Sequence, residues 1–327
     1  MSQNELNNIL SMLQDFSWGD TLAEMRANFN RCFSLPSHPT AQVQTLDADG
    51  VPAELITLPN SDPDRVILYL HGGGFVMGTR QTYRRIASDL AEASSARVLV
   101  IDYRLAPEHP YPAALEDTLT AYRWLVETRR FHPSQVAIAG DSAGGNLALA
   151  ALLSLRDTKE ILPSSGLLIS PYCDLTQTSS TIDTHGHLDL MVSRTLMDTL
   201  TAWYAPHENV KDPLISPIYA DLSGLPPLLI HVGAAEILLG DALRLAHQAA
   251  LANVAVELKV WQDMIHCFQL FAPMLEEGRV AISEAGAFLQ HHWSPKNRYE
   301  QETDRTMLAS LSQSPASRYR TGRSLPR

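Results

Sequence analysis

The 327-residue sequence has few cysteines and no long uninterrupted apolar run. Its three cysteines, Cys32, Cys173 and Cys267, are too few and too widely spaced for a disulfide framework or a zinc site, so we expect three free, buried thiols. No segment approaches the roughly 18 consecutive apolar residues of a membrane-spanning helix. Residues 1–10 have neither a basic start nor an apolar core, which predicts no signal peptide and a cytoplasmic location.

Basic residues are also scarce relative to acidic ones. The chain has 25 Lys and Arg against 36 Asp and Glu, a formal net charge of -11, which gives no electrostatic basis for binding nucleic acid. Residues 294–327 differ because they are basic, rich in serine and without core periodicity. We therefore predict a disordered basic tail there, and a weak anionic partner for it stays open.

Apolar runs and helical patterns alternate along most of the chain. Runs typical of buried strands occupy residues 66–70, 97–101, 136–139, 167–169, 228–232 and 254–260. Helical patterns separate most of these runs, at residues 83–93, 113–127, 144–155, 241–251 and 274–289. Continuous apolar runs joined through helices predict an α/β fold with a mostly parallel central sheet and helices on both faces.

Two segments fall outside this alternation and predict a helical cap. Residues 1–45 contain two short amphipathic helical patterns, interrupted near Gly19. Residues 174–217 contain a polar loop and a helix at about 193–204 but no strand, inserted where the carboxyl edge of the sheet is expected. We therefore expect a main domain over residues 46–293 that carries the insertion 174–217 as a lid.

The pentapeptide 140–144, GDSAG, lies between an apolar strand pattern and a helical pattern. In that context G-x-S-x-G predicts a strained turn that exposes a nucleophilic serine, Ser142, at the start of a helix. The flanking glycines, Gly140 and Gly144, provide the space that such a turn needs. The alternative is a plain strand-to-helix turn built from small residues. Asp141 is expected to hold neighbouring loops together.

A second glycine-rich segment, HGGG at residues 71–74, follows the strand pattern 66–70. Unshielded backbone N–H groups stabilise the oxyanion that forms in acyl transfer, so we predict Gly73, Gly74 and Ala143 as the donors. A phosphate-binding loop is the competing interpretation, but neither G-x-x-x-x-G-K-[ST] nor G-x-G-x-x-G follows. His71 is expected to brace the loop.

These motifs together resemble the hormone-sensitive-lipase family of esterases. The resemblance rests on HGGG at 71–74, GDSAGGN at 140–146 and the long segment IDYRLAPEHPYPAALED at 101–117, and it continues through 216–217, 225–227 and 265–268. It covers residues 53–289, matches the N-terminal helices loosely and implies the α/β-hydrolase fold. Within it, Glu108 and Arg104 are expected to form a structural network behind the site.

The general base is predicted at His266. In α/β-hydrolases the order along the chain is Ser, acid, His, and His266 follows the last strand pattern in a loop before the final helix. The family's histidine stands in a His-x-Phe arrangement, which residues 266–268 reproduce. His231 lies inside an apolar strand pattern and is expected in the core. His185 and His187 are expected to line the cap or the surface rather than bind a metal.

Glu236 is predicted as the acid that orients this histidine. The family usually has Asp-x-Leu-x-Asp after the preceding strand, whereas this chain has EILLGD at residues 236–241, with Glu236 at the position of the usual aspartate. A glutamate can still accept the imidazole N–H and stabilise the imidazolium. Asp241 is the second candidate and is otherwise expected to cap the helix that follows. Asp263 is the third.

The resemblance implies a serine carboxylesterase that acts on esters or lactones through an acyl-enzyme. Apolar residues in the N-terminal helices and in the insertion predict a modest acyl pocket, and therefore short- to medium-chain substrates. This chemistry requires no metal and no organic cofactor. An amidase or deacetylase would use the same residues, so it stays open. A non-catalytic, ligand-binding homologue would have lost the histidine that His266 provides, and a scaffold using the basic tail rests on composition alone. A small-molecule ester is the expected partner, with a homodimer left open.

Overall fold

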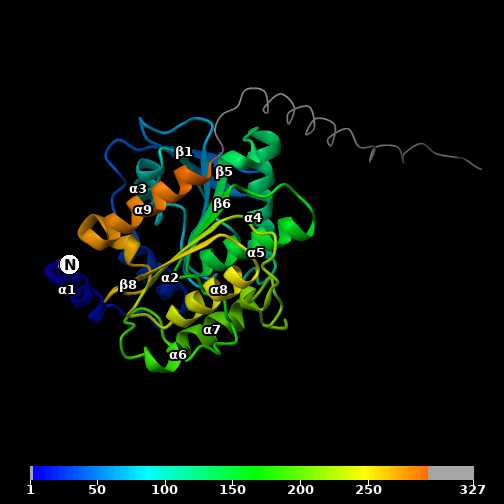
Figure 1. Cartoon of the computed structure of the whole chain (residues 1–327). Helices are drawn as coiled ribbons and strands as arrows, with labels where there is room; N and C mark the ends of the chain where they lie inside the picture. Colours follow the sequence, from blue (N-terminus) through cyan, green and yellow to red (C-terminus); the bar gives the residue numbers. More distant parts are fainter. Residues whose placement is uncertain (1–2, 294–327) are drawn as a thin grey trace, which may run out of the picture. The chain divides into compact units, whose positions relative to one another are not determined.

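The computed structural model describes residues 3–293, which form one sheet with helices on both faces (Figure 1). The prediction of a disordered basic tail concerns residues 294–327, which lie outside this range. The strands are β1 (Gln42–Asp47), β2 (Pro52–Thr57), β3 (Val66–Leu70), β4 (Arg97–Ile101), β5 (Val136–Asp141), β6 (Ser165–Ile169), β7 (Leu228–Gly233) and β8 (Val256–Trp261).

The helices lie before β1, between later strands and after β8. They are α1 (Gln3–Gln14), α2 (Leu22–Phe33), α3 (Arg84–Ser94), α4 (Ala113–Arg123), α5 (Ala143–Asp157), α6 (Thr181–Thr184), α7 (Arg194–Tyr204), α8 (Leu239–Leu251) and α9 (Glu276–His292). A short π-helical segment, Trp124–Thr128, extends α4, and short 3-10 segments lie at Pro133–Gln135, Pro217–Tyr219 and Phe268–Met274. Within the described range, none of the helices has both the length and the apolar character needed to cross a bilayer.

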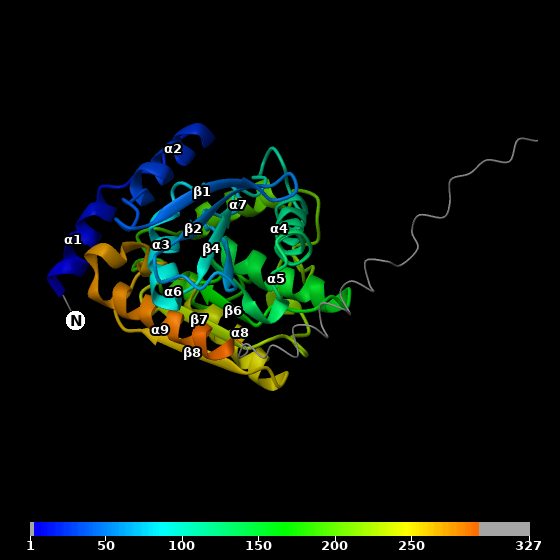
Figure 2. The same ribbon diagram turned by 90° about the horizontal axis from the view of Figure 1, so that it is seen from above.

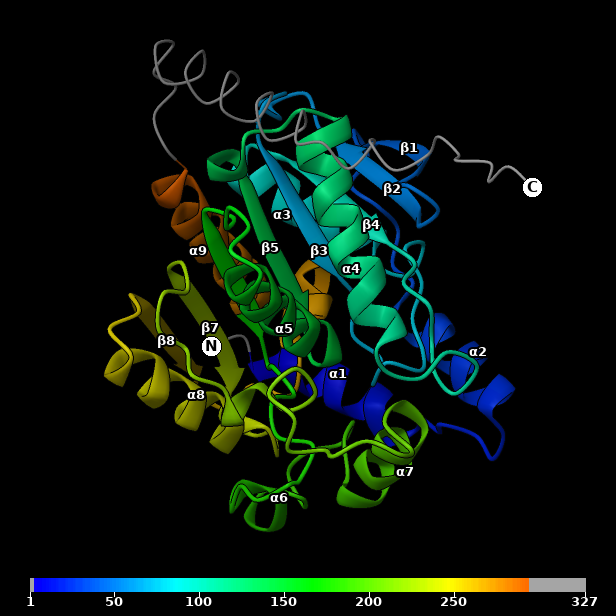
Figure 3. The same ribbon diagram turned by 90° about the vertical axis from the view of Figure 1, so that its right-hand side faces the viewer.

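The sheet runs in the order β1-β2-β4-β3-β5-β6-β7-β8, and its strands from β3 to β8 pair in parallel. In β3, β5, β6 and β7 every residue is buried, as expected for parallel strands covered on both sides. Helices α3 and α9 cover one face of the sheet, and α4, α5 and α8 cover the other (Figures 2 and 3). The predicted α/β fold with a mostly parallel sheet is confirmed.

Two strands of the sheet were not predicted from the sequence. β1 and β2 form an antiparallel hairpin at one edge, and β2 pairs antiparallel with β4. β1 is exposed and polar, so it has no apolar run, and β2 contains the charged Glu54. Glu54 is nevertheless buried, because the guanidinium group of Arg84 in α3 donates two hydrogen bonds to its carboxylate at 2.6 and 2.7 Å.

The order of the strands positions the functional segments. The chain passes from β3 to β4 on one side, then crosses to β5 on the other side, so β3 and β5 flank a topological switch point. Ligands of open α/β sheets bind at the carboxyl ends of strands at such a point. Leu70, the last residue of β3, pairs with Gly140 of β5, so the HGGG and GDSAG segments emerge side by side.

The segments predicted to form a cap lie together at this end of the sheet. Figure 3 shows α1, α2, α6 and α7 gathered beyond the carboxyl ends of the central strands. The predicted interruption between the two N-terminal helices is present, and α2 begins with a capping box between Thr21 and Glu24. The insertion contains α7, close to the predicted range, and also the four-residue α6.

Candidate active site

Ser142 occupies the turn between β5 and α5. Its φ of 52° and ψ of -118° are strained for a residue with a side chain, as expected for a nucleophile elbow. A Cβ on Gly144 would collide with the carbonyl group of Leu70, so this turn requires glycine there. The Ser142 N–H donates to the Ile169 carbonyl at 2.8 Å, and the Ser142 carbonyl accepts from the Tyr172 N–H at 3.0 Å. The sequence correctly predicted the position of this turn.

Gly73 and Gly74 follow β3 and face the same cavity as Ser142. Both have positive φ, 106° and 63°, and a Cβ on Gly74 would collide with Leu200 of α7. Ala143 is buried as the first residue of α5, where a backbone N–H has no partner within the helix. Among the described residues, no hydrogen bond uses the N–H groups of Gly73, Gly74 or Ala143. These N–H groups are therefore available as donors.

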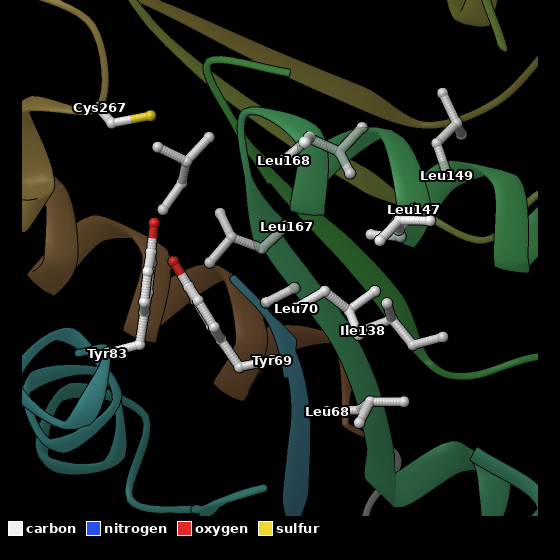
Figure 4. Close-up of a cluster of buried hydrophobic side chains, with 14 of the residues drawn as sticks. Leu68, Tyr69, Leu70, Tyr83, Ile138, Leu147, Leu149, Leu167, Leu168 and Cys267 are labelled. Carbon is white, nitrogen blue, oxygen red and sulfur yellow. The ribbon is translucent and has the colours of Figure 1, made fainter. Parts of the chain in front are cut away.

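Asp141 connects the glycine loop to the nucleophile turn. Its carboxylate accepts hydrogen bonds from the Gly72 N–H at 3.0 Å, the Tyr69 hydroxyl at 2.9 Å and the Tyr83 hydroxyl at 3.0 Å. Figure 4 shows the two tyrosine rings side by side with their hydroxyl groups at the same end. Burial raises the pKa of Asp141 to about 6, although these hydrogen bonds oppose the rise. Asp141 thus holds neighbouring loops together, as predicted.

His71 braces the glycine loop and is fully buried. Its ring stacks on Tyr103 with centroids 4.2 Å apart, and its Nδ1 donates to the Gly72 carbonyl at 2.8 Å. The Tyr103 hydroxyl in turn donates to the His71 carbonyl at 2.7 Å. Burial lowers the pKa of His71, so its ring is neutral at pH 7. These contacts match the bracing role predicted for this residue.

His266 and Glu236 come from the loops after β8 and β7 and meet in the interior. The His266 Nδ1 lies 3.3 Å from the Glu236 Oε2, with side chains 4% and 0% exposed. The Ser170 hydroxyl donates to the same carboxylate oxygen at 2.9 Å and accepts the Cys267 N–H at 3.2 Å. Ser170 therefore links the acid to the residue that follows the histidine.

Burial and charge act in opposite directions on this pair. Burial alone would lower the pKa of His266, but the adjacent carboxylate of Glu236, with the charges of Asp189 and Asp141, raises it above its ordinary value. Burial also raises the pKa of Glu236, and the contact with His266 opposes that rise. The protonated form of the His266 imidazole is thus stabilised by the carboxylate next to it.

The two other candidate acids lie elsewhere. Asp241 accepts hydrogen bonds from the N–H groups of Cys173 and Asp174, at 3.2 and 3.0 Å. It is also the third residue of α8, so the expectation that it caps the following helix is wrong: the helix begins earlier, at Leu239. Asp263 is exposed in a turn with φ of 60°.

The cavity at Ser142 is lined mainly by apolar side chains and has about 560 Å³ of space, including its open mouth. His266 lines the same cavity as Ser142. The remaining lining comes from the N-terminal segment, the insertion and the core: Trp18, Phe29, Phe33, Met77, Tyr83, Asp141, Tyr172, Met191, Val192, Leu196, Met197, Leu200, Leu238, Cys267 and Leu270. Residues 1–45 and 174–217 therefore both contribute walls to the cavity.

Three other histidines considered in the sequence lie away from Ser142 in the core or on the surface. His231 is buried in β7 against Trp261, and burial lowers its pKa to about 3. His185 and His187 lie on the partly or fully exposed surface of the insertion. In residues 3–293 no group of three or more His, Cys, Asp or Glu residues has a metal-binding arrangement.

The three cysteines are free, as predicted, but only Cys173 and Cys267 are buried, whereas Cys32 is half-buried on α2. The expectation of a third buried thiol is therefore wrong. Arg104 pairs with Asp117, inside the predicted structural network. Glu108 instead pairs with Arg26 of α2, whose guanidinium group also donates to the Ala106 carbonyl of the same loop.

Two residues of the site were missed in the sequence. Ser170 is one, and Asp189 is the other, a buried carboxylate in the insertion that raises the pKa of both Glu236 and His266. The only local signal for Ser170 is its position directly after β6, at the carboxyl edge of the sheet. Asp189 has no local signal, because it lies in an irregular segment.

Comparisons with known proteins agree with the α/β-hydrolase fold. A family model described as the alpha/beta hydrolase fold matches residues 67–270. An acetyl-hydrolase of Streptomyces hygroscopicus is 41% identical, over 71% of this chain and 77% of the relative. An esterase of Acinetobacter venetianus is 36% identical, over 79% of this chain and 84% of the relative. The crystal structure of an esterase from the bacterial hormone-sensitive lipase family superimposes with a TM-score of 0.87 at 42% identity, covering 89% and 99% of the two chains.

Proposed function

The chain belongs to the α/β-hydrolase family and is a carboxylic ester hydrolase of the hormone-sensitive-lipase type, and on this premise we propose that Ser142, His266 and Glu236 are its catalytic triad. One observation carries the proposal. A strained serine, a buried imidazole paired with a carboxylate, and backbone N–H groups without acceptors all border one apolar cavity.

The first half of the reaction forms an acyl-enzyme. The His266 Nδ1 faces Glu236, which leaves Nε2 as the nitrogen that removes the proton from the Ser142 hydroxyl. The Ser142 oxygen then attacks the ester carbonyl, and the negative charge on the carbonyl oxygen is stabilised by the N–H groups of Gly73, Gly74 and Ala143. His266 gives its proton to the leaving alkoxide, and the alcohol departs.

The second half releases the acid with the same groups. His266 removes a proton from a water molecule, and the resulting hydroxide attacks the acyl carbonyl on Ser142. The oxyanion forms a second time at the same N–H groups. Its collapse breaks the bond to Ser142, and the proton on His266 returns to the serine oxygen. Glu236 stabilises the imidazolium in both halves, consistent with the raised pKa of His266.

The walls of the cavity support short- to medium-chain esters or lactones as substrates. Apolar side chains from α2 and α7, including Phe33 and Leu200, surround the space next to Ser142. The relative from Streptomyces hygroscopicus is named an acetyl-hydrolase, which agrees with a small acyl group.

The test is hydrolysis of a series of p-nitrophenyl esters from acetate to decanoate by the wild-type protein and Ser142→Ala. We expect a maximum of kcat/KM at short or medium chains and a loss on the order of 10⁴-fold or more in the variant, since only binding and the oxyanion donors remain. Wild-type rates in Ser142→Ala would exclude this nucleophile. Anilide analogues in the same assay distinguish an esterase from an amidase, and faster cleavage of anilides than of esters would contradict our proposal.

A further inference from the structure

Asp189 is a buried carboxylate of the insertion that forms a hydrogen bond to the turn carrying Glu236. Its side chain belongs to the loop before α7, and the residue is only 8% exposed. The Oδ1 atom accepts the N–H groups of Met191 and Val192, both at 2.9 Å. The Oδ2 atom accepts the N–H group of Ile237 at 3.0 Å.

These three hydrogen bonds join two functional turns. Met191 and Val192 form part of the cavity wall. Ile237 directly follows Glu236, so its backbone helps to set the position of that carboxylate. One aspartate thus connects a wall of the substrate cavity to the proposed acid, although 48 residues separate Asp189 from Ile237 along the chain.

From these contacts we propose that Asp189 is a positioning residue, which fixes the Glu236 turn relative to the Met191–Val192 wall and places a second negative charge beside the Glu236–His266 pair. This inference deepens the proposed function and rests on it. Among the described residues, Asp189 does not line the cavity and forms no hydrogen bond with the His266 ring. It therefore acts through the backbone of Ile237, Met191 and Val192 and through its own charge.

The charges around His266 support the proposal that Asp189 adds a negative charge near the Glu236–His266 pair. The carboxylates of Glu236, Asp189 and Asp141 act electrostatically on its ring, and the Cys267 Sγ lies 3.4 Å from its Nε2. The three carboxylates raise the pKa of His266, against the effect of burial. Removal of the Asp189 charge should therefore lower that pKa and move the acidic limb of kcat/KM to lower pH, because the base must be neutral to act.

The experiment compares Asp189→Asn and Asp189→Glu with the wild-type protein, with Asp183→Asn as a control. Asp183 is an exposed carboxylate of the same insertion, 74% accessible and paired with Arg194. The measurements are kcat/KM across the p-nitrophenyl ester series, its pH profile, and the NMR titration of the His266 ring in a Ser142→Ala background. This titration does not depend on turnover, so it tests the inference even if the proposed nucleophile is wrong.

In Asp189→Asn we expect the midpoint of the His266 titration at lower pH. We also expect kcat/KM about tenfold lower, because the triad is misplaced, and a changed dependence of kcat/KM on ester chain length. Asp189→Glu keeps the charge, so its midpoint should stay near the wild-type value while the chain-length profile changes. The control should match the wild-type protein throughout. A wild-type midpoint in Asp189→Asn, or an equal shift in both variants, would overturn the proposal. If Asp189→Asn does not fold, an unchanged chain-length profile in Asp189→Glu would overturn it.

Discussion

At the scale of single residues, Glu236 has a carboxylate one methylene farther from the backbone than the aspartate of the usual family pattern. The additional rotatable bond has to be restrained if the carboxylate is to stay 3.3 Å from the His266 Nδ1. Ser170 provides such a restraint, because its hydroxyl donates to the Oε2 atom that faces the ring. The longer acid is thus held by a neighbour that comes from a different strand.

We predict that Glu236→Gln and Asp241→Asn differ sharply in activity. The amide of Glu236→Gln cannot stabilise an imidazolium, so kcat/KM should fall on the order of 10³-fold or more. Asp241 accepts two backbone N–H groups, those of Cys173 and Asp174, and in the part of the chain that the structure describes it forms no hydrogen bond with His266. An asparagine oxygen can still accept these two N–H groups, so the rate of Asp241→Asn should stay within about threefold of the wild-type rate. Steady-state kinetics with p-nitrophenyl butyrate measure both. A nearly unchanged rate in Glu236→Gln would remove it from the triad.

At the scale of helices and strands, Arg26 joins helix α2 to two loops, the one that follows the glycine segment and the one after β4. Arg26 of α2 donates to the carbonyl groups of Val76 and Ala106 at 2.8 and 2.9 Å, and to both oxygens of Glu108. The hydrogen bond from Arg26 lowers the pKa of Glu108 to about 2, so the pair stays ionised at the pH of any ordinary assay. Because α2 also provides Phe29 and Phe33 to the cavity wall, the position of this helix affects substrate binding.

We predict that Arg26→Gln raises KM for p-nitrophenyl butyrate about three- to tenfold and changes kcat little, because α2 forms a wall and touches no reacting group. The matched control is Arg31→Gln, an exposed arginine on the same helix. Its kinetics should equal those of the wild-type protein. If both variants have the same KM, the Arg26 contacts do not position the wall.

At the scale of the whole molecule, buried carboxyl groups determine how stability depends on pH. Burial, together with the charge of Asp174, raises the pKa of Asp241 to about 8, whereas an aspartate in the unfolded chain titrates near pH 4. Between these values the folded protein retains a proton that the unfolded chain has lost. The free energy of unfolding therefore falls as pH rises across this window.

We predict that Asp241→Asn removes this part of the pH dependence. Its side chain is neutral at every pH, so the Tm of the variant should rise relative to that of the wild-type protein as pH increases from about 5 to about 9. Thermal unfolding followed by circular dichroism at several pH values gives both curves. Parallel curves would show that Asp241 titrates at its ordinary pKa in the folded protein.

Much of the fold was predictable because its signals are local. An apolar run such as residues 66–70 predicts a buried parallel strand from its own composition, and a glycine-flanked serine between strand and helix predicts a tight turn. β2 was missed because its charged Glu54 is neutralised by Arg84, an ion pair that only the folded chain forms. β1 was missed because an exposed edge strand needs no apolar residues.

The sequence alone determined the order of strands and main helices from β3 onward, the serine turn and the glycine loop, since each depends on neighbouring residues and their backbone preferences. Only the tertiary structure decided which carboxylate meets which ring. Ser170 stands 66 residues from Glu236 along the chain, and Asp189 reaches the same turn from the insertion. Such contacts form only when the parallel strands bring their carboxyl ends to one edge, and no pattern within a short segment encodes that arrangement.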